Sequence, residues 1–568
     1  MTENPLYIAF VWNQHQPYYK DTQKNEFIMP WVRLHAVKDY YQMAAILKKY
    51  PHIKQTFNIT PSLLSQLKDY LKGYKDYYQM VMKPVDQLTH REKRFILLHY
   101  FDIHWERVIA HYPRYHELLS KQGFHREPEG FTTLPEFSPQ DYLDLQVWFN
   151  LVWIDPELRE NDPFLSSLLE RGRDYSEADK QELMKKQEEI MAGVIPLHRE
   201  LQDGGQIEIM TTPYYHPIMP LLIENRSVRR ANPGLPLPRY FAYPEDVRQQ
   251  LAKALRQYQD LFGQKPQGLW PPEMAVSPEV IPMLTDFGFA WTISDEGILT
   301  ASLGVEVRRD EYGHALNPSV IYQPYWLATH GTEIPIIFRD HYLSDMIGFT
   351  YHDWNPVDAA ENLLHRFHKI RENLQGAPGT YLVVISMDGE NAWEWYHNDK
   401  KDFLNHLYYR LEQEKAFQTV TVSEYLKAHP PRQTIKKLHS GSWVDQSMTR
   451  WIGTENKNVL WNYLAGVRAD FENFRIHQED EKKLARALEN LYIAEGSDYP
   501  WWVDSMPYYL AAPFEALFRR HLTGVYEILG QEVPGYLKKS ILDSWPDDSP
   551  GLETLEGPTT MVRGGAAD

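Results

Sequence analysis

Two carboxylates in this sequence follow short apolar runs and have a tryptophan close by. Glu273 ends the segment Trp-Pro-Pro-Glu at residues 270–273, and Asp388 opens the segment at residues 388–393 that ends in Trp393. Either could be structural, because an acid stabilises the first turn of a helix and Asp-Gly is a common turn pair. Together they fit the carboxylate pair of glycoside hydrolysis, in which one acid protonates the leaving oxygen and the other attacks the sugar or activates water.

Other polar residues follow apolar runs in the same way. Asn13 and His15 follow the first run, and His216 follows the third. His15 and His216 could bind zinc with Asp39 or Asp388, because imidazole and carboxylate are zinc ligands. However, no HExxH motif or histidine pair with metal-binding spacing occurs at these places. The pattern favours hydrogen bonding to a substrate, and we expect neither a metal nor a cofactor.

Several other chemistries lack their motifs in this chain. It has no GxxxxGK[ST] or GxGxxG phosphate-binding loop and no GxSxG nucleophile elbow. It has no cysteine, which excludes disulfides, thiolate metal sites and a cysteine nucleophile. The net charge of −18 argues against nucleic acid as a partner. Aromatic residues make up 14% of the chain and offer flat surfaces for sugar rings among other uses.

Seven short apolar runs predict the buried parallel strands that would position these side chains. Helical spacing between most of them, as at residues 36–50, 244–263 and 356–374, predicts βαβ units and a parallel sheet, either open or closed into a barrel. Active-site residues of such folds gather at the carboxyl ends of the strands. The seven runs are residues 6–12, 53–59, 206–212, 267–270, 289–294, 334–339 and 381–387.

The pattern also predicts how the chain is divided. A mostly helical insertion is expected at about residues 70–200, with Ser176 at the start of its clearest amphipathic helix. Strand signals stop near Ala428, so residues 1–428 are expected to form the α/β unit. Residues 429–545 are expected to form a helical region packed on it, and residues 546–568, rich in Gly, Pro and acid, a flexible tail.

Targeting signals are weak. The apolar run at residues 6–12 is too short for the core of a signal peptide, and no run reaches the roughly 18 residues of a membrane span. The sequence therefore predicts a soluble, cytoplasmic protein with no membrane partner.

Five segments, in this order, resemble motifs of glycoside hydrolase family 57. They are HQP at residues 15–17, GQIEIMTTPYYHP at 205–217, GLWPPE at 268–273, MDGENAW at 387–393 and EGSDYPWW at 495–502. The resemblance implies an α-glucan-active enzyme whose fold is an incomplete (β/α)7 barrel of parallel strands followed by a helical region. The segments look most like the amylopullulanase and α-amylase branch, with 4-α-glucanotransferases as relatives.

Carried over by position, the resemblance makes Glu273 the nucleophile and Asp388 the general acid/base of a retaining double displacement. Asp388 would begin protonated, and we expect the nearby charges of Glu273 and Glu390 to raise its pKa. One departure is Asn13, which stands where many members have a histidine; an amide still hydrogen-bonds a hydroxyl but does not titrate. The residues expected to bind substrate are Asn13, His15, His216, Trp270, Glu390, Trp393, Trp395, Asp498 and Trp501.

Three functions remain open from the sequence. The first is a retaining hydrolase of α-1,6 and/or α-1,4 glucosidic bonds, acting on pullulan, starch, glycogen or maltodextrin. The second is a 4-α-glucanotransferase or branching-type transglycosylase, in which a sugar hydroxyl replaces water. The third is a catalytically silent glucan-binding protein. Aromatic subsites that hold a sugar acceptor would decide between the first two. The candidates, which could equally be packing residues, are Trp393, Trp395, Tyr396, Trp501 and Trp502.

Overall fold

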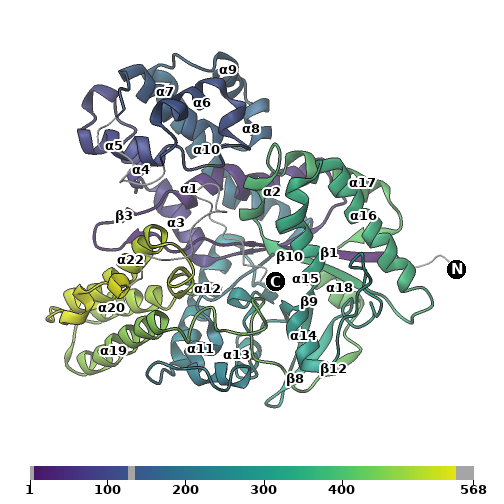
Figure 1. The fold of residues 1–568 in the computed structure, drawn as a ribbon. Coiled ribbons are helices and arrows are strands. Elements are labelled where there is room, and N and C mark those ends of the chain that lie inside the picture. The colour runs from purple at the N-terminus through teal and green to yellow at the C-terminus, as the bar shows by residue number, and fades with distance from the viewer. Residues whose placement is uncertain (1–4, 126–134, 545–568) are drawn as a thin grey trace.

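The computed structural model describes residues 5–125 and 135–544 (Figure 1). The tail expected at residues 546–568 lies outside the described residues. Within them the chain is an α/β fold in which helices surround parallel strands, as predicted from the alternation of apolar runs and helical spacing.

All seven predicted strands are present, and they pair with one another in parallel. Their backbone groups are satisfied by neighbouring strands, so near-continuous apolar runs can be buried on both faces. The seven are β1 (Leu6–Gln14), β4 (Gln55–Ile59), β5 (Ile207–Met210), β6 (Gly268–Leu269), β7 (Trp291–Asp295), β9 (Thr332–Arg339) and β10 (Leu382–Asp388).

The seven strands lie in two sheets that are in backbone contact at two places. The first has the order β10-β1-β4-β5, with β11 (Phe417–Thr419) also pairing with β1, and the second has the order β12-β8-β9-β7-β6. A parallel bridge between Thr211 and Leu269 joins β5 to β6. Between β9 and β10, the Asp340 amide donates to the Val384 carbonyl at 2.8 Å. All seven predicted strands therefore lie in one continuous circuit of backbone contacts.

The second sheet contains two strands that the sequence did not predict. β8 (Tyr325–Thr329) runs antiparallel to β9, and β12 (Gln433–Ile435) runs parallel to β8. The expectation that strands stop near Ala428 is therefore wrong by one strand. β12 was missed because it is three residues long and only Ile435 is buried.

The insertion at about residues 70–200 is helical, as predicted, and stands apart at the top of Figure 1. Its longest helix, α10 (Glu177–Asp203), begins at Ser176, whose hydroxyl accepts from the Asp179 amide in a capping box. The insertion has its own cluster of buried apolar residues. Its other long helices are α5 (His90–His99), α6 (Pro113–Gln122), α7 (Pro139–Val152) and α9 (Pro163–Arg171).

The chain after β12 is mostly helical from residue 455 to residue 529. The helices are α19 (Glu455–His477), α20 (Glu481–Ala494), α21 (Asp498–Trp502) and α22 (Tyr508–Leu529). Arg468 of α19 donates to Asp246 of α12 (Pro244–Phe262) through Nε at 2.8 Å and Nη2 at 3.0 Å. This buried pair fixes the late helices to the α/β part. No helix in the described residues is long and apolar enough to cross a membrane.

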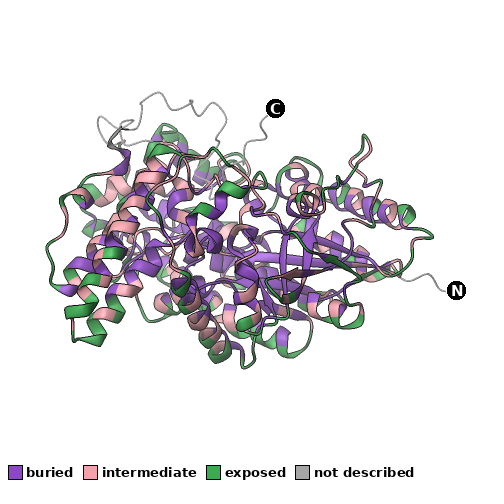
Figure 2. Ribbon diagram, turned by 90° about the horizontal axis from the view of Figure 1, so that it is seen from below, coloured by how far each residue is buried: buried purple, intermediate pink, exposed green. Residues whose placement is uncertain are grey.

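Burial follows the strands and the inner faces of the helices, leaving the exposed residues on the outside (Figure 2). One buried cluster is charged. The Lys400 ammonium, which precedes α17 (Lys401–Gln413), lies 2.8 Å from Asp155, 2.9 Å from Asp399 and 3.1 Å from Asp39. Asp39 precedes α2 (Tyr41–Ala45) and Asp155 caps α8 (Pro156–Asn161) of the insertion. Lys400 thus joins the insertion to the α/β part.

Lys400→Met should destabilise the protein by about 3–5 kcal/mol, because it leaves the buried Asp155 carboxylate without the cation that it contacts, whereas Asp39 and Asp399 keep Lys38. Thermal unfolding followed by circular dichroism would measure this. The neighbouring Lys401→Met is the control, because Lys401 pairs with a half-exposed Glu160 and should change stability by no more than about 1 kcal/mol. Equal effects of the two substitutions would contradict a stabilising role for the Lys400 cluster.

Candidate active site

Asp388 is the last residue of β10, and the strand register places polar partners beside it. β1 pairs Asn13 with Asp388 on one side and with Asn58 of β4 on the other. Asn13 Nδ2 donates to Asp388 Oδ1 at 2.9 Å, and Asn58 Nδ2 donates to Asn13 Oδ1 at 2.7 Å. Asn13 therefore orients the Asp388 carboxylate through a chain of amides fixed by three adjacent strands.

Glu273 lies on a one-turn helix, Pro272–Met274, that follows β6. Its backbone has φ 57° and ψ 25°, a left-handed conformation that costs a non-glycine residue about 1–3 kcal/mol. Trp443 holds it at two points: the Trp443 amide donates to the Glu273 carbonyl at 3.2 Å, and the indole Nε1 donates to Oε2 at 2.9 Å. Such strain is maintained only when the surroundings fix the residue, as they do here.

His15 and His216 lie beside the two carboxylates with their rings stacked, 3.8 Å between centroids. His15 Nε2 lies 2.9 Å from Asp498 Oδ1, and His216 Nδ1 lies 2.9 Å from Ser497 Oγ and 3.9 Å from Glu273 Oε1. Ser497 and Asp498 come from the start of α21. The late helices therefore contribute directly to the candidate site.

The two imidazoles have opposite electrostatics. Burial works against a charge on His15, but Asp498, Glu273 and Asp388 outweigh it and raise the pKa of His15 above its ordinary value. Burial and the neighbouring His15 hold the pKa of His216 well below its ordinary value. The pKa of His15 thus lies above that of its neighbour His216, and both imidazoles can hydrogen-bond hydroxyl groups.

Burial dominates the protonation of the carboxylate pair. Burial and the Asp388 charge raise the pKa of Glu273 to about 8, although His15 and the Trp443 indole oppose this. Burial raises the pKa of Asp388, whereas Asn13, His15, Arg339 and Asn391 lower it. The pKa of Asp388 is raised, as predicted, but the main cause is burial and not the charge of Glu273 or Glu390.

Glu390 supports the site from behind. It is 1% exposed and accepts from the His15 amide at 3.2 Å, the Tyr40 hydroxyl at 3.2 Å and Gln16 Nε2 at 3.4 Å. Burial and the charges of Asp388 and Asp39 raise the pKa of Glu390 well above its usual range. A side chain so enclosed holds the His15 segment against the Asp388 loop and has no surface for a sugar.

The two tryptophans expected as walls are both fully buried. Trp270 packs edge-to-face on Trp443 at 5.7 Å, and the Trp393 indole donates to the Gly389 carbonyl at 2.9 Å. Their proximity to Glu273 and Asp388 in sequence therefore reflects packing behind the carboxylates. Tyr396 is likewise buried, and its hydroxyl donates to the Ile347 carbonyl at 2.6 Å.

The other candidate tryptophans keep exposed area. Trp395 is half-buried, with its ring 4.9 Å from that of His104 in the insertion. Trp501 is half-buried beneath the Arg450 guanidinium at 4.4 Å. Trp502, also half-buried, stacks on Phe514 at 4.2 Å. These rings can offer a face to a ligand, which Trp270 and Trp393 cannot.

The sequence reasoning missed two residues, Trp443 and Arg339. Trp443 lies in residues 436–454, which contain no helix or strand and gave no periodic signal. Arg339 ends β9, and its position at the carboxyl end of a predicted strand was a usable signal. Its Nη1 donates to the carbonyl of Ser386, two residues before Asp388, at 3.2 Å.

Metal ligands were a competing interpretation of the same polar residues. In residues 5–125 and 135–544, no three His, Asp or Glu side chains are grouped as a metal site requires. Asp39 lies in the Lys400 cluster and bonds His35 at 2.7 Å, whereas His15 bonds Asp498. The structure does not bring Asp39 together with His15 as metal ligands.

Glu273→Gln should stabilise the protein increasingly as the pH rises. The pKa of Glu273 rises from 4.5 to about 8 on folding. Below pH 4.5 the carboxyl is protonated in both states, so the shift does not affect stability. Above pH 4.5 only the unfolded state ionises, and the free energy of unfolding of the wild type falls by up to about 1.4 kcal/mol per pH unit until the folded state also ionises. Gln does not titrate, and we expect a gain of about 1–3 kcal/mol at pH 8 and little at pH 5.

Calorimetry at the two pH values measures this difference. Glu361→Gln is the control of opposite sign, because His406 and Arg410 outweigh burial and lower the pKa of Glu361. The ion pairs of Glu361 stabilise the fold at pH values above the ordinary pKa of glutamate. Replacing this carboxylate should therefore lower the free energy of unfolding at pH 8. A Glu273→Gln effect independent of pH would mean that this carboxyl is not protonated by burial.

Comparison with known proteins agrees with this architecture. The chain is 22% identical to an α-amylase of Pyrococcus abyssi over 251 residues, 43% of this chain and 31% of the relative. It is 23% identical to a 1,4-α-glucan branching enzyme of Thermococcus kodakarensis over 387 residues, 55% of this chain and 52% of the relative. The chain thus matches about a third to a half of the length of these curated relatives.

Solved structures share the fold over almost the whole chain. A crystal structure of the Thermococcus branching enzyme has a TM-score of 0.58 at 16% identity, covering 94% of both chains. The α-amylase AmyC from Thermotoga maritima has a TM-score of 0.54 at 14% identity, covering 94% of this chain and 96% of that one. The model of glycosyl hydrolase family 57 matches residues 9–437, three quarters of the sequence and all the strands that carry the site. The chain therefore belongs to glycosyl hydrolase family 57.

Proposed function

We propose that the protein is a retaining α-glucan hydrolase that cleaves α-1,6 and/or α-1,4 glucosidic bonds of starch, glycogen, pullulan or maltodextrin. The observation that carries the proposal is the polar group at the carboxyl ends of β1, β6 and β10. There, Glu273 and Asp388 are partly exposed carboxyls with raised pKa values, and the charge of each raises the pKa of His15. Perturbed carboxylates paired in this way are typical of catalytic sites.

The first step would form a covalent intermediate. Protonated Asp388 gives its proton to the glycosidic oxygen as that oxygen leaves with the aglycone part of the glucan. The Glu273 carboxylate attacks the anomeric carbon from the opposite face, and the C–O bond to the leaving group breaks as the bond to Glu273 forms. In the second step Asp388 takes a proton from water, and that water displaces Glu273.

This mechanism requires one proton on the carboxylate pair, and that proton must be on Asp388 when the glycosidic bond breaks, although burial also favours the protonated form of Glu273 in the free enzyme. Burial disfavours two negative charges, so the pair retains a proton near neutral pH. The Trp443 indole stabilises ionised Glu273 by donating to Oε2. Asn13 and Asn391 orient Asp388 through both oxygens at 2.9 and 3.4 Å. His15 and His216 supply hydrogen bonds for sugar hydroxyls beside the pair.

A transglycosylase is the second candidate, favoured by the half-exposed rings of Trp395 and Trp501. Both steps of the displacement are the same, except that a sugar hydroxyl replaces water. An acceptor stacked on these rings would exclude water from the glycosyl-enzyme. The similarity to a branching enzyme is compatible with this outcome.

We also infer that the fold is an incomplete (β/α)7 barrel. The bridge from Thr211 to Leu269 and the hydrogen bond from Asp340 to Val384 support this reading. The catalytic unit would extend past Ala428 through β12 to Trp443, and the helical region would follow it.

Glu273→Gln and Asp388→Asn should each lower turnover on pullulan or amylose by about a thousandfold or more, as expected when an essential group is lost. An aryl α-maltoside with an acidic phenol as leaving group separates the roles. Asp388→Asn should retain much more of its first step on this substrate, because the phenol leaves without protonation. Azide should rescue Glu273→Ala and yield a β-glycosyl azide. Near-normal turnover in either variant, or azide rescue with the opposite anomer, would overturn the assignment of roles.

Incubation with maltopentaose and chromatography of the products tests the fate of the intermediate. Only shorter products are expected from a hydrolase, whereas longer ones indicate transfer. If transfer occurs, Trp395→Ala should raise the ratio of hydrolysis to transfer several-fold by removing an aromatic surface on which the acceptor sugar can pack. Tyr409→Ala is the control, because Tyr409 is an exposed aromatic residue on α17. Binding of maltodextrin without any product would instead identify a glucan-binding protein.

A further inference from the structure

Arg339 contacts the supports of both carboxylates. It ends β9, and Nε donates to Asp295 Oδ2 at 2.6 Å, which fixes the plane of the guanidinium. Nη1 donates to the Ser386 carbonyl at 3.2 Å. Ser386 is two residues before Asp388 on β10, so Arg339 holds the end of the strand that carries Asp388.

The face of the same guanidinium packs on Trp443. Its carbon lies 4.9 Å from the centre of the indole ring, a cation–π contact. The edge of that indole donates to Glu273 Oε2 at 2.9 Å, and its backbone amide donates to the Glu273 carbonyl at 3.2 Å. Arg339 therefore reaches Asp388 through a strand and Glu273 through an aromatic ring.

The charged groups around Arg339 come from three elements. Asp295 ends β7, His341 and Asp345 lie on α15 (His341–Asp345), and Asp388 ends β10. His341 bonds Asp295 at 2.9 Å and Asp345 at 3.0 Å, and these two hydrogen bonds raise the pKa of His341 to about 10. The Asp345 carboxylate also lies 3.8 Å from Arg339 Nη1. Two cations thus face Asp295 and Asp345, whose charges they balance.

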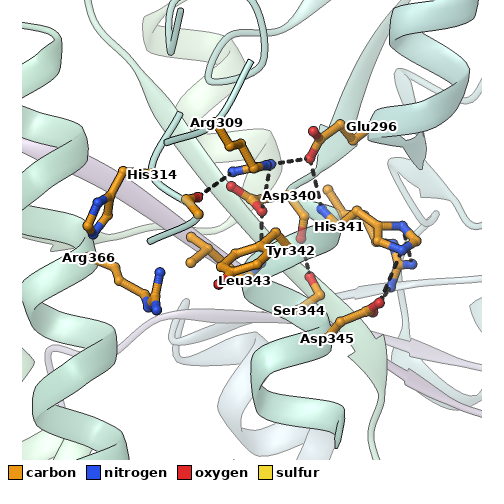
Figure 3. Close-up of polar contacts among 12 residues, drawn as sticks. Glu296, Arg309, His314, Asp340, His341, Tyr342, Leu343, Ser344, Asp345 and Arg366 are labelled. Atoms are coloured by element: carbon orange, nitrogen blue, oxygen red, sulfur yellow. Dashed lines mark hydrogen bonds and ion pairs between the residues drawn. The ribbon is translucent and has the colours of Figure 1, made fainter. Parts of the chain in front are cut away.

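A second layer holds this arrangement in place. Figure 3 shows Arg309 between Glu296 and Asp340, with His341 directed toward Asp345. Asp340 Oδ1 caps α15 by accepting from the Leu343 amide at 2.8 Å, and the same oxygen accepts from Arg309 Nη2 at 3.2 Å. Since β7, β9 and α15 are joined in this way, the Arg339 side chain is fixed and not free to reorient.

We propose that Arg339 and Trp443 are a pair of positioning residues. Together they hold Glu273 and Asp388, which share a single proton, in the arrangement that double displacement requires. The inference rests on the proposed function. Neither residue transfers a proton or attacks the sugar. Trp443 favours the ionised form of Glu273 by hydrogen bonding, and the positive charge of Arg339 favours the ionised form of Asp388 while its contacts fix the strand end.

This role makes a directional prediction for pH dependence. The active form of the pair carries one proton, and the basic limb of the profile of kcat/KM marks the loss of that proton in the free enzyme. The indole N–H and the guanidinium both stabilise negative charge, so removing either one raises the pKa of the carboxylate it serves. The inactive, doubly ionised form then appears at higher pH.

Trp443→Phe is the mild test, because it keeps an aromatic ring against Arg339 and removes only the donor. We expect the basic limb to move up by about half a pH unit or more, and kcat/KM at its maximum to fall about tenfold or more, as for loss of a hydrogen bond to a charged group. Trp148→Phe is the matched control. Trp148 is also buried and its indole donates to the Gly172 carbonyl at 3.1 Å, but it lies in the insertion on α7.

Arg339→Lys and Arg339→Met separate charge from geometry. Lysine keeps the positive charge but lacks the several N–H donors of the guanidinium, so kcat should fall while the basic limb stays at the same pH. Methionine loses both, so kcat should fall and the limb should also move to higher pH. Circular dichroism and the melting temperature establish that each variant is folded. Should both Arg339 variants fail to fold, the Trp443→Phe profile alone decides the proposal.

Two results for Trp443→Phe would overturn the inference. The first is a pH profile of kcat/KM that matches the wild type, and the second is a profile lowered by the same factor at every pH, with the basic limb unmoved. The second result would show that Trp443 acts only through packing. Both results require an active wild type, so they leave the proposed function intact. An inactive wild type, by contrast, contradicts the proposed function itself and is recognised before any variant is made.

Discussion

The pairing of β1 with its two neighbours is the constraint on which the site depends. β1 lies between β10 and β4 in parallel register, which brings Asn13 level with Asp388 and Asn58 at one edge of the sheet. A shift by one residue would turn every side chain of β1 to the opposite face and remove Asn13 from Asp388. Both faces of β1 are buried, but Ile8, Phe10 and Trp12 pack in one apolar cluster and the smaller Ala9 and Val11 in another, so the shift would exchange large and small side chains in a packed core. The same hydrophobic pattern that forms the core therefore aligns the carboxylate.

The site concentrates features that a fold selected for stability alone would avoid. Glu273, Asp388 and Glu390 are carboxyls whose pKa values burial raises, so the fold disfavours their ionised forms. Glu273 and His216 have left-handed backbones. These costs are tolerated because neighbouring groups over-determine each position, as Trp443 does for Glu273. A site that must hold charge out of water needs such a surrounding shell.

The sequence was sufficient for the seven parallel strands and for placing Glu273 and Asp388 just after or at strand ends, because both rest on local signals. Buried parallel strands are continuous apolar runs, and polar residues directly after them must lie at the carboxyl edge. Trp270 and Trp393 were misjudged as sugar-contacting walls because nearness in sequence does not tell which way a ring points; both rings point into the core. Trp443 could not be found, since it reaches Glu273 by a chain path without periodic structure.

Electrostatic detail was also beyond the sequence. The motif implied that neighbouring charges raise the pKa of Asp388, yet depth of burial has the larger effect, and depth depends on packing of the complete molecule. Likewise, the contact between Arg339 and Trp443 joins residues about a hundred positions apart on different elements. Only the folded chain reveals that the two carboxylates have a common support.

The contact between His15 and Asp498 joins the first strand to a helix 483 residues later. During synthesis, the strands that carry Glu273 and Asp388 emerge from the ribosome well before α21. A nascent chain would then hold both carboxylates while His15 still lacks its acidic partner and His216 lacks Ser497. Contacts of such long sequence separation form late and slowly. The order in which the chain is made thus keeps the polar centre incomplete until α21 has been synthesised, which couples the completion of the site to the docking of the late helices.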